Sequence, residues 1–156
     1  MDLRLIYAVI LSILPVSELR GGLIYALAAG LNPWISFAAC TIANILIIFF
    51  IFFFLDKIHA KLLKIAFYRN SFEFYLEKIQ KKTDKFEKHY SILGFFALTI
   101  FTAIPLPVIG GAWSWALISW ILDLDRKKSI LAISLGVLIA GLLVLFGTLG
   151  FFNLFK

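Results

Sequence analysis

The chain contains four long apolar segments, and two of them carry no charge at all. Residues 33–55 and 129–152 are runs of 23 and 24 residues without Asp, Glu, Lys or Arg. At about 1.5 Å per residue, each can cross a hydrocarbon core of ~30 Å as a tilted α-helix. Because 62% of the 156 residues are hydrophobic, a soluble fold of this size could not bury them. We therefore expect an all-α integral membrane protein.

The other two apolar segments, residues 5–31 and 91–122, are interrupted near their middles. Proline removes a backbone donor and glycine weakens a helix, so each segment is expected to form two short arms joined by irregular backbone. The interrupting residues are Pro15, Gly21 and Gly22 in the first segment and Pro105, Pro107, Gly110 and Gly111 in the second. The arm 112–122 would rise only ~16 Å, about half of the hydrocarbon core.

Basic residues indicate which side of the membrane each connection faces. Nine of the 15 Lys and Arg residues lie between positions 57 and 88, and three more are at 126–128. Basic clusters beside apolar spans mark cytoplasmic loops, so the linker 56–90 and the loop 123–128 are both expected in the cytoplasm. The segment between them must then return to the side it left. Two full crossings with a turn need ~40 residues and only 32 are available, so a re-entrant hairpin is predicted.

The two halves of the chain also resemble each other. At an offset of 90, Pro15 matches Pro105, Gly21 matches Gly111, and the Ala-Leu pair at 26–27 recurs at 116–117. A hairpin plus one span crosses the membrane once, so the second copy must start on the opposite side. We therefore predict two inverted repeats, an architecture shared by many secondary transporters, with both termini outside.

These patterns divide the chain into three parts. Repeat 1 is residues 1–55, with a re-entrant hairpin at 5–31 and a transmembrane helix at 33–55. Repeat 2 is residues 91–156, with a hairpin at 91–122 and a transmembrane helix at 129–152. The linker 56–90 has apolar residues at helical spacing among Lys and Glu. It is either a basic amphipathic helix on the inner leaflet or an ordinary solvated connector helix.

Glu18 and Arg20 are the only charges inside the four apolar segments. Charge at this depth is costly unless it is paired or hydrated, and it is usually functional. The functional interpretation is that Arg20 binds an anionic group while Glu18 takes up or releases a proton. The structural alternative is a Glu–Arg pair that locks the hairpin.

The predicted breaks also create a backbone site for an anion. The second arm of each hairpin would begin near a glycine pair, so its unpaired amides and positive dipole end would lie inside the membrane. Breaks at matching places in two repeats indicate a binding site. The candidate substrate-binding residues are therefore Arg20, Gly21, Gly22, Gly110 and Gly111, with Pro15, Pro105 and Pro107 at the hairpin apices.

Other classes of function find little support. The net charge of +6 follows the membrane-flanking loops, so no nucleic-acid partner is expected. His59 and His89 lie 30 residues apart and Cys40 is the single cysteine, so no metal or other cofactor is expected. No nucleophile with its base is visible, and we expect no enzyme.

Two motifs carry a resemblance to a known family. The stretch Pro15–Gly22 (PVSELRGG) and the stretch Ala103–Trp113 (AIPLPVIGGAW) resemble the signatures of the small multidrug export proteins. That family looks like a branch of the DedA/VTT superfamily. This resemblance implies a fold of two inverted repeats, each with one re-entrant hairpin. The resemblance implies a lipid or lipid-phosphate carrier of the plasma membrane, some relatives of which are linked to proton-driven transport.

One feature departs from that pattern. DedA proteins typically carry intramembrane arginines in the second half, whereas residues 91–122 contain none. This weakens the match to a polyprenyl-phosphate flippase, although a homodimer would supply a second arginine.

The leading hypothesis is a transporter of an amphiphilic anion such as a lipid phosphate, coupled to protons through Glu18. The alternatives are a small multidrug or organic-ion exporter, and a passive lipid scramblase or structural membrane protein.

Overall fold

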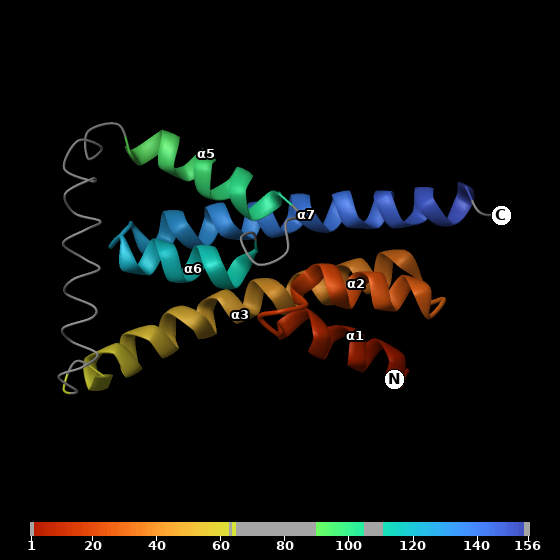
Figure 1. The fold of residues 1–156 in the computed structure, drawn as a ribbon, viewed down its shortest axis with the longest axis horizontal. Helices are drawn as coiled ribbons and strands as arrows, with labels where there is room; N and C mark the ends of the chain where they lie inside the picture. The colour runs from red at the N-terminus through yellow and green to blue at the C-terminus, as the bar shows by residue number, and fades with distance from the viewer. Residues whose placement is uncertain (1, 63, 65–89, 105–110, 155–156) are drawn as a thin grey trace.

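The computed structural model describes residues 2–62, 64, 90–104 and 111–154 (Figure 1). Within these residues every regular element is an α-helix. In chain order they are α1 (Leu3–Ile13), α2 (Glu18–Ala28), α3 (Pro33–Leu62), α5 (Tyr90–Ala103), α6 (Ala112–Ile121) and α7 (Arg126–Leu154). Most of the predicted linker 56–90, the predicted apex residues Pro105 and Pro107, and the predicted substrate-binding Gly110 lie outside the described residues.

Helices α3 and α7 are long and apolar enough to cross a membrane. The two candidate spans are Pro33–Ile58 in α3 and Arg126–Phe151 in α7, each of 26 residues, and an 18-residue window within each has a mean hydropathy of 2.7. A helix of that length measures about 39 Å, which exceeds a hydrocarbon core of ~30 Å. Both helices extend beyond the spans 33–55 and 129–152 predicted from charge-free runs, because a helix continues into flanking charged residues that reach the interface. The prediction of an all-α fold is confirmed for the described residues, and two of the helices are candidate membrane spans.

Both long helices begin at a side-chain cap. The Asn32 side chain accepts hydrogen bonds from the amides of Trp34 (3.0 Å) and Ile35 (3.2 Å) at the start of α3. The Asp125 carboxylate accepts one from the amide of Lys128 (2.9 Å) at the start of α7. These caps satisfy amides that have no partner within the helix, and so fix where each span begins.

The short helices are arms that cover part of the long ones. Helices α2 and α6 have 11 and 10 residues, so each measures only about 16 Å or less, roughly half of a hydrocarbon core. The first apolar segment is interrupted between Ile13 and Glu18, around Pro15, which has no amide to continue the helical hydrogen bonds.

The helices are arranged with an approximate twofold relation (Figure 1). Helices α3 and α7 both run along the length of the molecule and diverge toward the left of the picture, with α1 and α2 toward the right end and α5 and α6 toward the left end. Half a turn in the plane of the picture would exchange α1 with α5, α2 with α6 and α3 with α7. Each half reaches into the other, because α2 packs on α7 and α6 packs on α3.

The two hairpins differ in how their arms pack. Helices α1 and α2 lie against each other, whereas α5 packs mainly along α7 and makes little contact with α6. The close approach of α1 and α2 depends on Gly22, where a Cβ would overlap the Ser12 hydroxyl and the Ala8 carbonyl. In the second half, α5 approaches α7 through Gly136, where a Cβ would stand 2.7 Å from the Thr99 carbonyl.

The turns that follow α2 and α6 have the same backbone hydrogen bonds. After α2 the Leu31 amide donates to the Ala26 carbonyl (3.1 Å), and after α6 the Leu124 amide donates to the Ser119 carbonyl (3.0 Å). Both partners in the second turn are 93 positions after those in the first. Such bonds back to the last helical turn close a helix end and direct the chain into the next helix.

The positive φ angles follow the same offset. Within the described residues, φ is positive at Glu18 (50°), Gly30 (75°), Gly111 (115°) and Asp123 (50°). Glu18 pairs with Gly111 and Gly30 pairs with Asp123, each at a separation of 93. The first arms, in contrast, end at Ile13 and Ala103, which are 90 apart. The offset of 90 predicted from the sequence therefore applies to the ends of the first arms, whereas an offset of 93 applies beyond the breaks.

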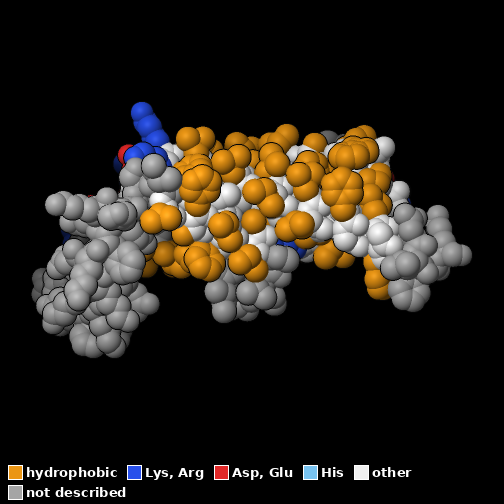
Figure 2. All heavy atoms as spheres, turned by 90° about the horizontal axis from the view of Figure 1, so that it is seen from above, with side chains coloured by type: hydrophobic (Ala, Val, Ile, Leu, Met, Phe, Trp, Pro, Cys, Tyr) orange, Lys and Arg blue, Asp and Glu red, His pale blue; other side chains and the backbone are white. Residues whose placement is uncertain are grey.

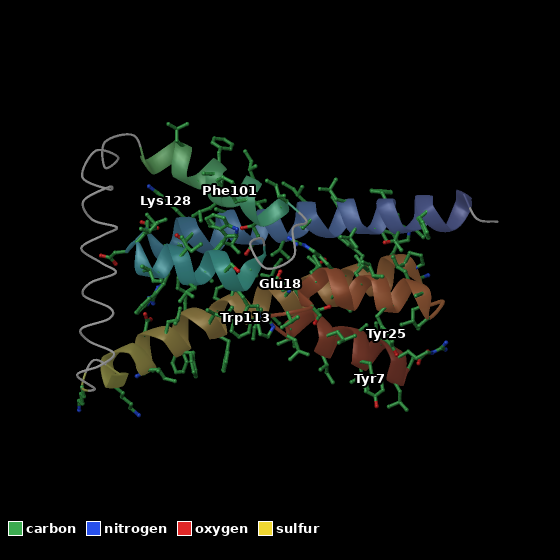
Figure 3. All side chains as sticks on the ribbon, viewed as in Figure 1. Tyr7, Glu18, Tyr25, Phe101, Trp113 and Lys128 are labelled. Carbon is green, nitrogen blue, oxygen red and sulfur yellow. The ribbon has the colours of Figure 1, made fainter. Side chains whose placement is uncertain are left out.

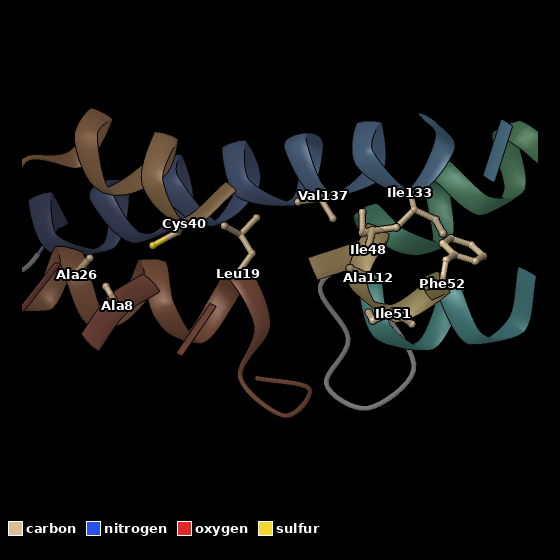
Figure 4. Close-up of a cluster of buried hydrophobic side chains, with 11 residues drawn as sticks. Ala8, Leu19, Ala26, Cys40, Ile48, Ile51, Phe52, Ala112, Ile133 and Val137 are labelled. Atoms are coloured by element: carbon tan, nitrogen blue, oxygen red, sulfur yellow. The ribbon is translucent and has the colours of Figure 1, made fainter. Parts of the chain in front are cut away.

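The core joins both halves, and the remaining apolar surface faces outward. The main buried cluster includes Leu19 from α2, Cys40 and Ile48 from α3, Ala112 from α6 and Val137 from α7 (Figure 4). Large hydrophobic side chains such as those of α3 and α7 cover the long side of the molecule, and described Lys and Arg side chains gather beyond one end of this apolar band (Figure 2). Surface of this kind suits contact with lipid tails.

Candidate functional site

Glu18 lies near the middle of the molecule, where the start of α2 meets the start of α6 (Figure 3). It is the first residue of α2, and its side chain is buried, with 7% of its surface exposed. Its carboxylate accepts a weak hydrogen bond from the amide of Trp113 (3.4 Å), in the first turn of α6. The only acidic residue of the four apolar segments is therefore held by the other half of the chain.

Gly111 makes this approach possible. It precedes α6, and a Cβ added there would overlap the carboxyl group of Glu18. Its φ of 115° is also a conformation that side chains rarely adopt. Gly111 was predicted as a ligand-binding glycine, and in this structure the group that occupies its open face is the Glu18 carboxylate.

Arg20 makes the corresponding contact with the end of α5. Its Nη2 donates hydrogen bonds to the carbonyl oxygens of Ile104 (2.7 Å) and Thr102 (3.5 Å). These carbonyls belong to the last turn of α5 and the residue after it, so the helix has no amides to pair with them. The Arg20 side chain is half-buried and stays inside the same central region.

The two charges match the dipoles of the helices that they contact. A helix N-terminus carries a partial positive charge and a C-terminus a partial negative charge. Glu18 meets the N-terminus of α6 and Arg20 meets the C-terminus of α5, so both contacts are favourable. The contacts between the halves thus offset part of the cost of placing charge at this depth.

The open end of α1 is closed by the same kind of contact. The indole Nε1 of Trp113 donates to the Ile13 carbonyl (2.9 Å), and the Asn44 amide donates to the Ser12 carbonyl (2.6 Å). Trp113 comes from α6 and Asn44 from α3. The Asn44 side chain thus satisfies a carbonyl at the end of α1 that the interruption of the helix leaves without a helical partner.

A small cavity of about 10 Å³ lies beside these residues, enough for one water molecule. Its polar lining comes from Glu18, Arg20, Asn44 and Thr102, and its other walls are Leu19, Gly111, Ala112, Val137 and Ala140. Both halves contribute, but the space does not admit a lipid headgroup in this conformation. No group of three metal-ligating side chains forms within the described part of the chain.

The remaining predicted site residues lie elsewhere or outside the described chain. Gly22 is packed against α1, and a Cβ at Gly21 would stand 2.6 Å from the Ser17 Cβ, so both glycines are in contact with protein. Neither is part of the cavity wall. Pro15 lies in the turn between α1 and α2.

A second polar cluster, which sequence reasoning missed, joins the halves at the end nearer the linker. Arg126 at the start of α7 forms an ion pair with Asp56 near the end of α3 (2.6 Å). The indole Nε1 of Trp120 donates to the same carboxylate (2.9 Å), and Arg126 lies over the Phe52 ring at 5.4 Å. The available signal was Asp56 itself, an acid directly after the second apolar segment, but its partner is 70 residues away.

Comparison with known proteins gives one match. A family model described as "Putative small multi-drug export protein" matches residues 18–143. That range starts at Glu18 and includes Arg20, Gly111 and Trp113. No curated protein and no solved structure matches the chain.

Proposed function

Because the chain belongs to the small multi-drug export protein family, we propose that it is a multi-pass membrane transporter that moves an amphiphilic anion. The substrate class that we favour is a lipid with a phosphate headgroup, and Glu18 couples its movement to protons. The observation that carries the proposal is the contact of Glu18 with the N-terminus of α6, in the middle of the two long helices.

The contact suggests a simple exchange. The amides at the start of α6 form an anion site, and the Glu18 carboxylate occupies it. Protonation would remove the charge that favours this contact, and a substrate anion could then take its place beside Arg20. A return of the proton to solution would restore the carboxylate and expel the anion. Movement of the start of α2 away from the start of α6 would open the small cavity to one side of the membrane.

The proposal includes the inverted-repeat architecture. The approximate twofold relation between the helices, the shared offset of 93 and the exchange of arms between the halves all support it. Under this arrangement the hairpins dip into the membrane without crossing it. The basic end lies in the cytoplasm with the linker, both termini lie outside, and the protein resides in the plasma membrane. A distant relationship to the DedA/VTT superfamily, inferred from the two break motifs, fits the same architecture.

The family description favours a second candidate, the export of drugs or other organic ions. The charges favour an anion over a cation as the transported species. A cation bound at Glu18 would stand beside Arg20, which carries a positive charge in every state, so the loaded site would keep a net positive charge inside the membrane. An anion bound with protonated Glu18 leaves no net charge. We propose transport rather than catalysis, since the described residues that line the cavity include no nucleophile with a base.

The test is transport by purified protein in vesicles under an imposed pH gradient. The cargo is a short-chain fluorescent lipid with a phosphate headgroup, and a parallel assay uses a lipophilic organic cation. We expect wild-type protein to move the anionic lipid in response to the gradient, and Glu18→Gln to reduce this movement to the rate of protein-free vesicles. Asp123→Asn is the matched control, because it makes the same carboxylate-to-amide change at an exposed turn residue whose positive φ suits Asn.

The outcomes separate the candidates. Movement of the cation and not of the lipid would establish the exporter and overturn the anion proposal. Lipid movement that ignores the gradient and persists in Glu18→Gln would identify a passive scramblase. Movement of neither cargo would remove the transport proposal and leave Glu18 and Arg20 as structural residues.

A further inference from the structure

Arg20 and Trp113 occupy equivalent positions in the two halves. They are separated by 93 residues, the offset shared by the positive-φ residues and by the turns after α2 and α6. Each side chain also makes the same kind of contact with the other half. Arg20 donates to the Ile104 carbonyl just after α5, and Trp113 donates to the Ile13 carbonyl at the end of α1. One half therefore uses a cation where the other uses a neutral indole.

This difference sets the charge of the central site. Within the described residues, Glu18 and Arg20 are the charged side chains at the cavity. The groups that face them from neighbouring helices are neutral: Asn44 from α3, Thr102 from α5, Gly111 and Ala112 at the start of α6, and Val137 and Ala140 from α7. Cys40, also on α3, packs near Ser12 rather than in the cavity wall.

From this charge count we infer that the site takes an anion with a single negative charge. Trp113 sets this limit, because its neutral indole occupies the position that is equivalent to Arg20 in the other half. The inference rests on the proposed function and specifies its substrate. With Glu18 protonated, Arg20 neutralises one negative charge. A second negative charge would remain uncompensated at a depth where charge is costly.

The limit of one negative charge on the bound anion distinguishes two kinds of lipid phosphate. A phosphodiester headgroup without other charges carries one negative charge across the neutral pH range. A phosphomonoester has a second ionisation near pH 6, so it is mostly doubly charged above neutrality. The site thus favours the diester at alkaline pH, and it accepts the monoester once acid has removed that second charge. One proton bound by Glu18 accompanies each anion, so the loaded site is electrically neutral.

The test compares two fluorescent lipids that share their acyl chain and differ in headgroup, one phosphodiester and one phosphomonoester. Wild-type protein in vesicles is assayed with both lipids at each pH, and the ratio of the two rates is reported, because any titration of Glu18 then cancels. At pH ~8 we expect the diester to move more than about tenfold faster than the monoester. At pH ~5.5 the ratio should approach one.

Variants at residue 113 test its role. Trp113→Arg should bring the ratio at alkaline pH toward one by supplying the missing cation. Trp113→Gln is the control, because it keeps a hydrogen-bond donor without a charge and should leave the ratio as in wild type. If Trp113→Arg does not fold, the pH dependence of the wild-type ratio decides the charge limit without it.

Three results would overturn the inference. Equal rates for the two lipids at alkaline pH would show that the site accepts a double charge. An unchanged ratio in folded Trp113→Arg would remove Trp113 as its cause. If neither lipid moves but the organic cation does, the proposed function fails as well. Movement of the lipids without discrimination refutes the single-charge limit alone.

Discussion

The carboxylate of Glu18 lies in the space that a side chain at residue 111 would fill. The two residues come from opposite halves of the chain, and Gly111 meets the carboxylate with a φ of 115°. The contact brings an acid onto the N-terminus of α6 and holds the two interrupted segments together at mid-length. The stability of the fold and the proposed transport therefore both depend on the Glu18 carboxylate and the backbone at Gly111.

Gly111→Ala should destabilise the folded protein. The added methyl overlaps the Glu18 carboxyl, and the backbone must also keep a positive φ that alanine resists. We expect a loss of about 1–3 kcal/mol in the free energy of unfolding, measured by denaturation in detergent micelles. Gly147→Ala is the control, because nothing lies within 4 Å of its added Cβ, and it should not destabilise α7.

A double variant shows which of the two causes dominates. Glu18→Ala combined with Gly111→Ala removes the overlap but not the backbone strain. If overlap matters, the two changes together should cost less than the sum of the single changes. Strict additivity would mean that the carboxylate and Gly111 are not coupled, which contradicts the geometry described above.

Arg20→Met should remove the two hydrogen bonds that Arg20 donates to carbonyl oxygens at the end of α5. The side chains have similar length, but methionine cannot donate to the Ile104 and Thr102 oxygens. Hydrogen bonds to a charged group contribute about 1.5–3 kcal/mol, and we expect a loss of stability in that range. Arg4→Met is the comparison at the exposed end of α1, where Arg4 donates to the Ala29 carbonyl, and it should cost less stability than Arg20→Met because the exposed group is solvated. Equal losses for both variants would refute the special role of Arg20.

Trp113 and Trp115 provide a matched pair. The indole of Trp113 donates to the Ile13 carbonyl, whereas the buried Nε1 of Trp115 has no hydrogen-bond partner among the described residues. Trp113→Phe should therefore lower the free energy of unfolding by about 1 kcal/mol more than Trp115→Phe. The replacement at 115 also keeps an aromatic ring to stack on Phe101. Thermal unfolding of both variants measures the difference, and a larger loss at 115 would contradict it.

Much of the helical architecture was predictable because it depends on local sequence. The uncharged runs and their flanking polar residues specify α3 and α7, and Pro15 specifies where the first segment breaks. The contacts of Glu18 and Arg20 with α6 and α5 were not predictable. Those partners lie more than 80 residues away, and nothing near positions 18 or 20 indicates which helix ends they meet.

The alignment of the two halves was likewise not fully predictable from the sequence. Matching residues 15–27 to 105–117 aligned Gly21 with Gly111, but the positive φ of Gly111 corresponds to that of Glu18. The two offsets, 90 and 93, differ by three residues, which is close to one helical turn, so an apolar pattern looks similar in either register. Only the backbone angles and turn hydrogen bonds separate the two alignments. The corrected register is what brings Arg20 and Trp113 into equivalence.

The last prediction concerns the sides of the membrane on which the two ends of the molecule lie. Asp2 precedes α1 at one end of the apolar band, and Lys128 lies at the start of α7 near the other, with Asp56 and Arg126 (Figure 3). Single cysteines at positions 2 and 128, in a Cys40→Ser background, should react with a membrane-impermeant maleimide from opposite sides. In intact cells we expect labelling at 2 and protection at 128, with labelling at 128 restored when the membrane is opened.

The background change is safe to make because Cys40 is a small buried side chain, and serine retains its size. An exposed position on the same helix end, such as Lys127→Cys, should behave as 128 does and controls for local reactivity. Labelling of 2 and 128 from one side would mean that the two halves enter the membrane in the same direction. The anion site could not then be shared between inverted hairpins, and Glu18 would meet α6 for structural reasons alone.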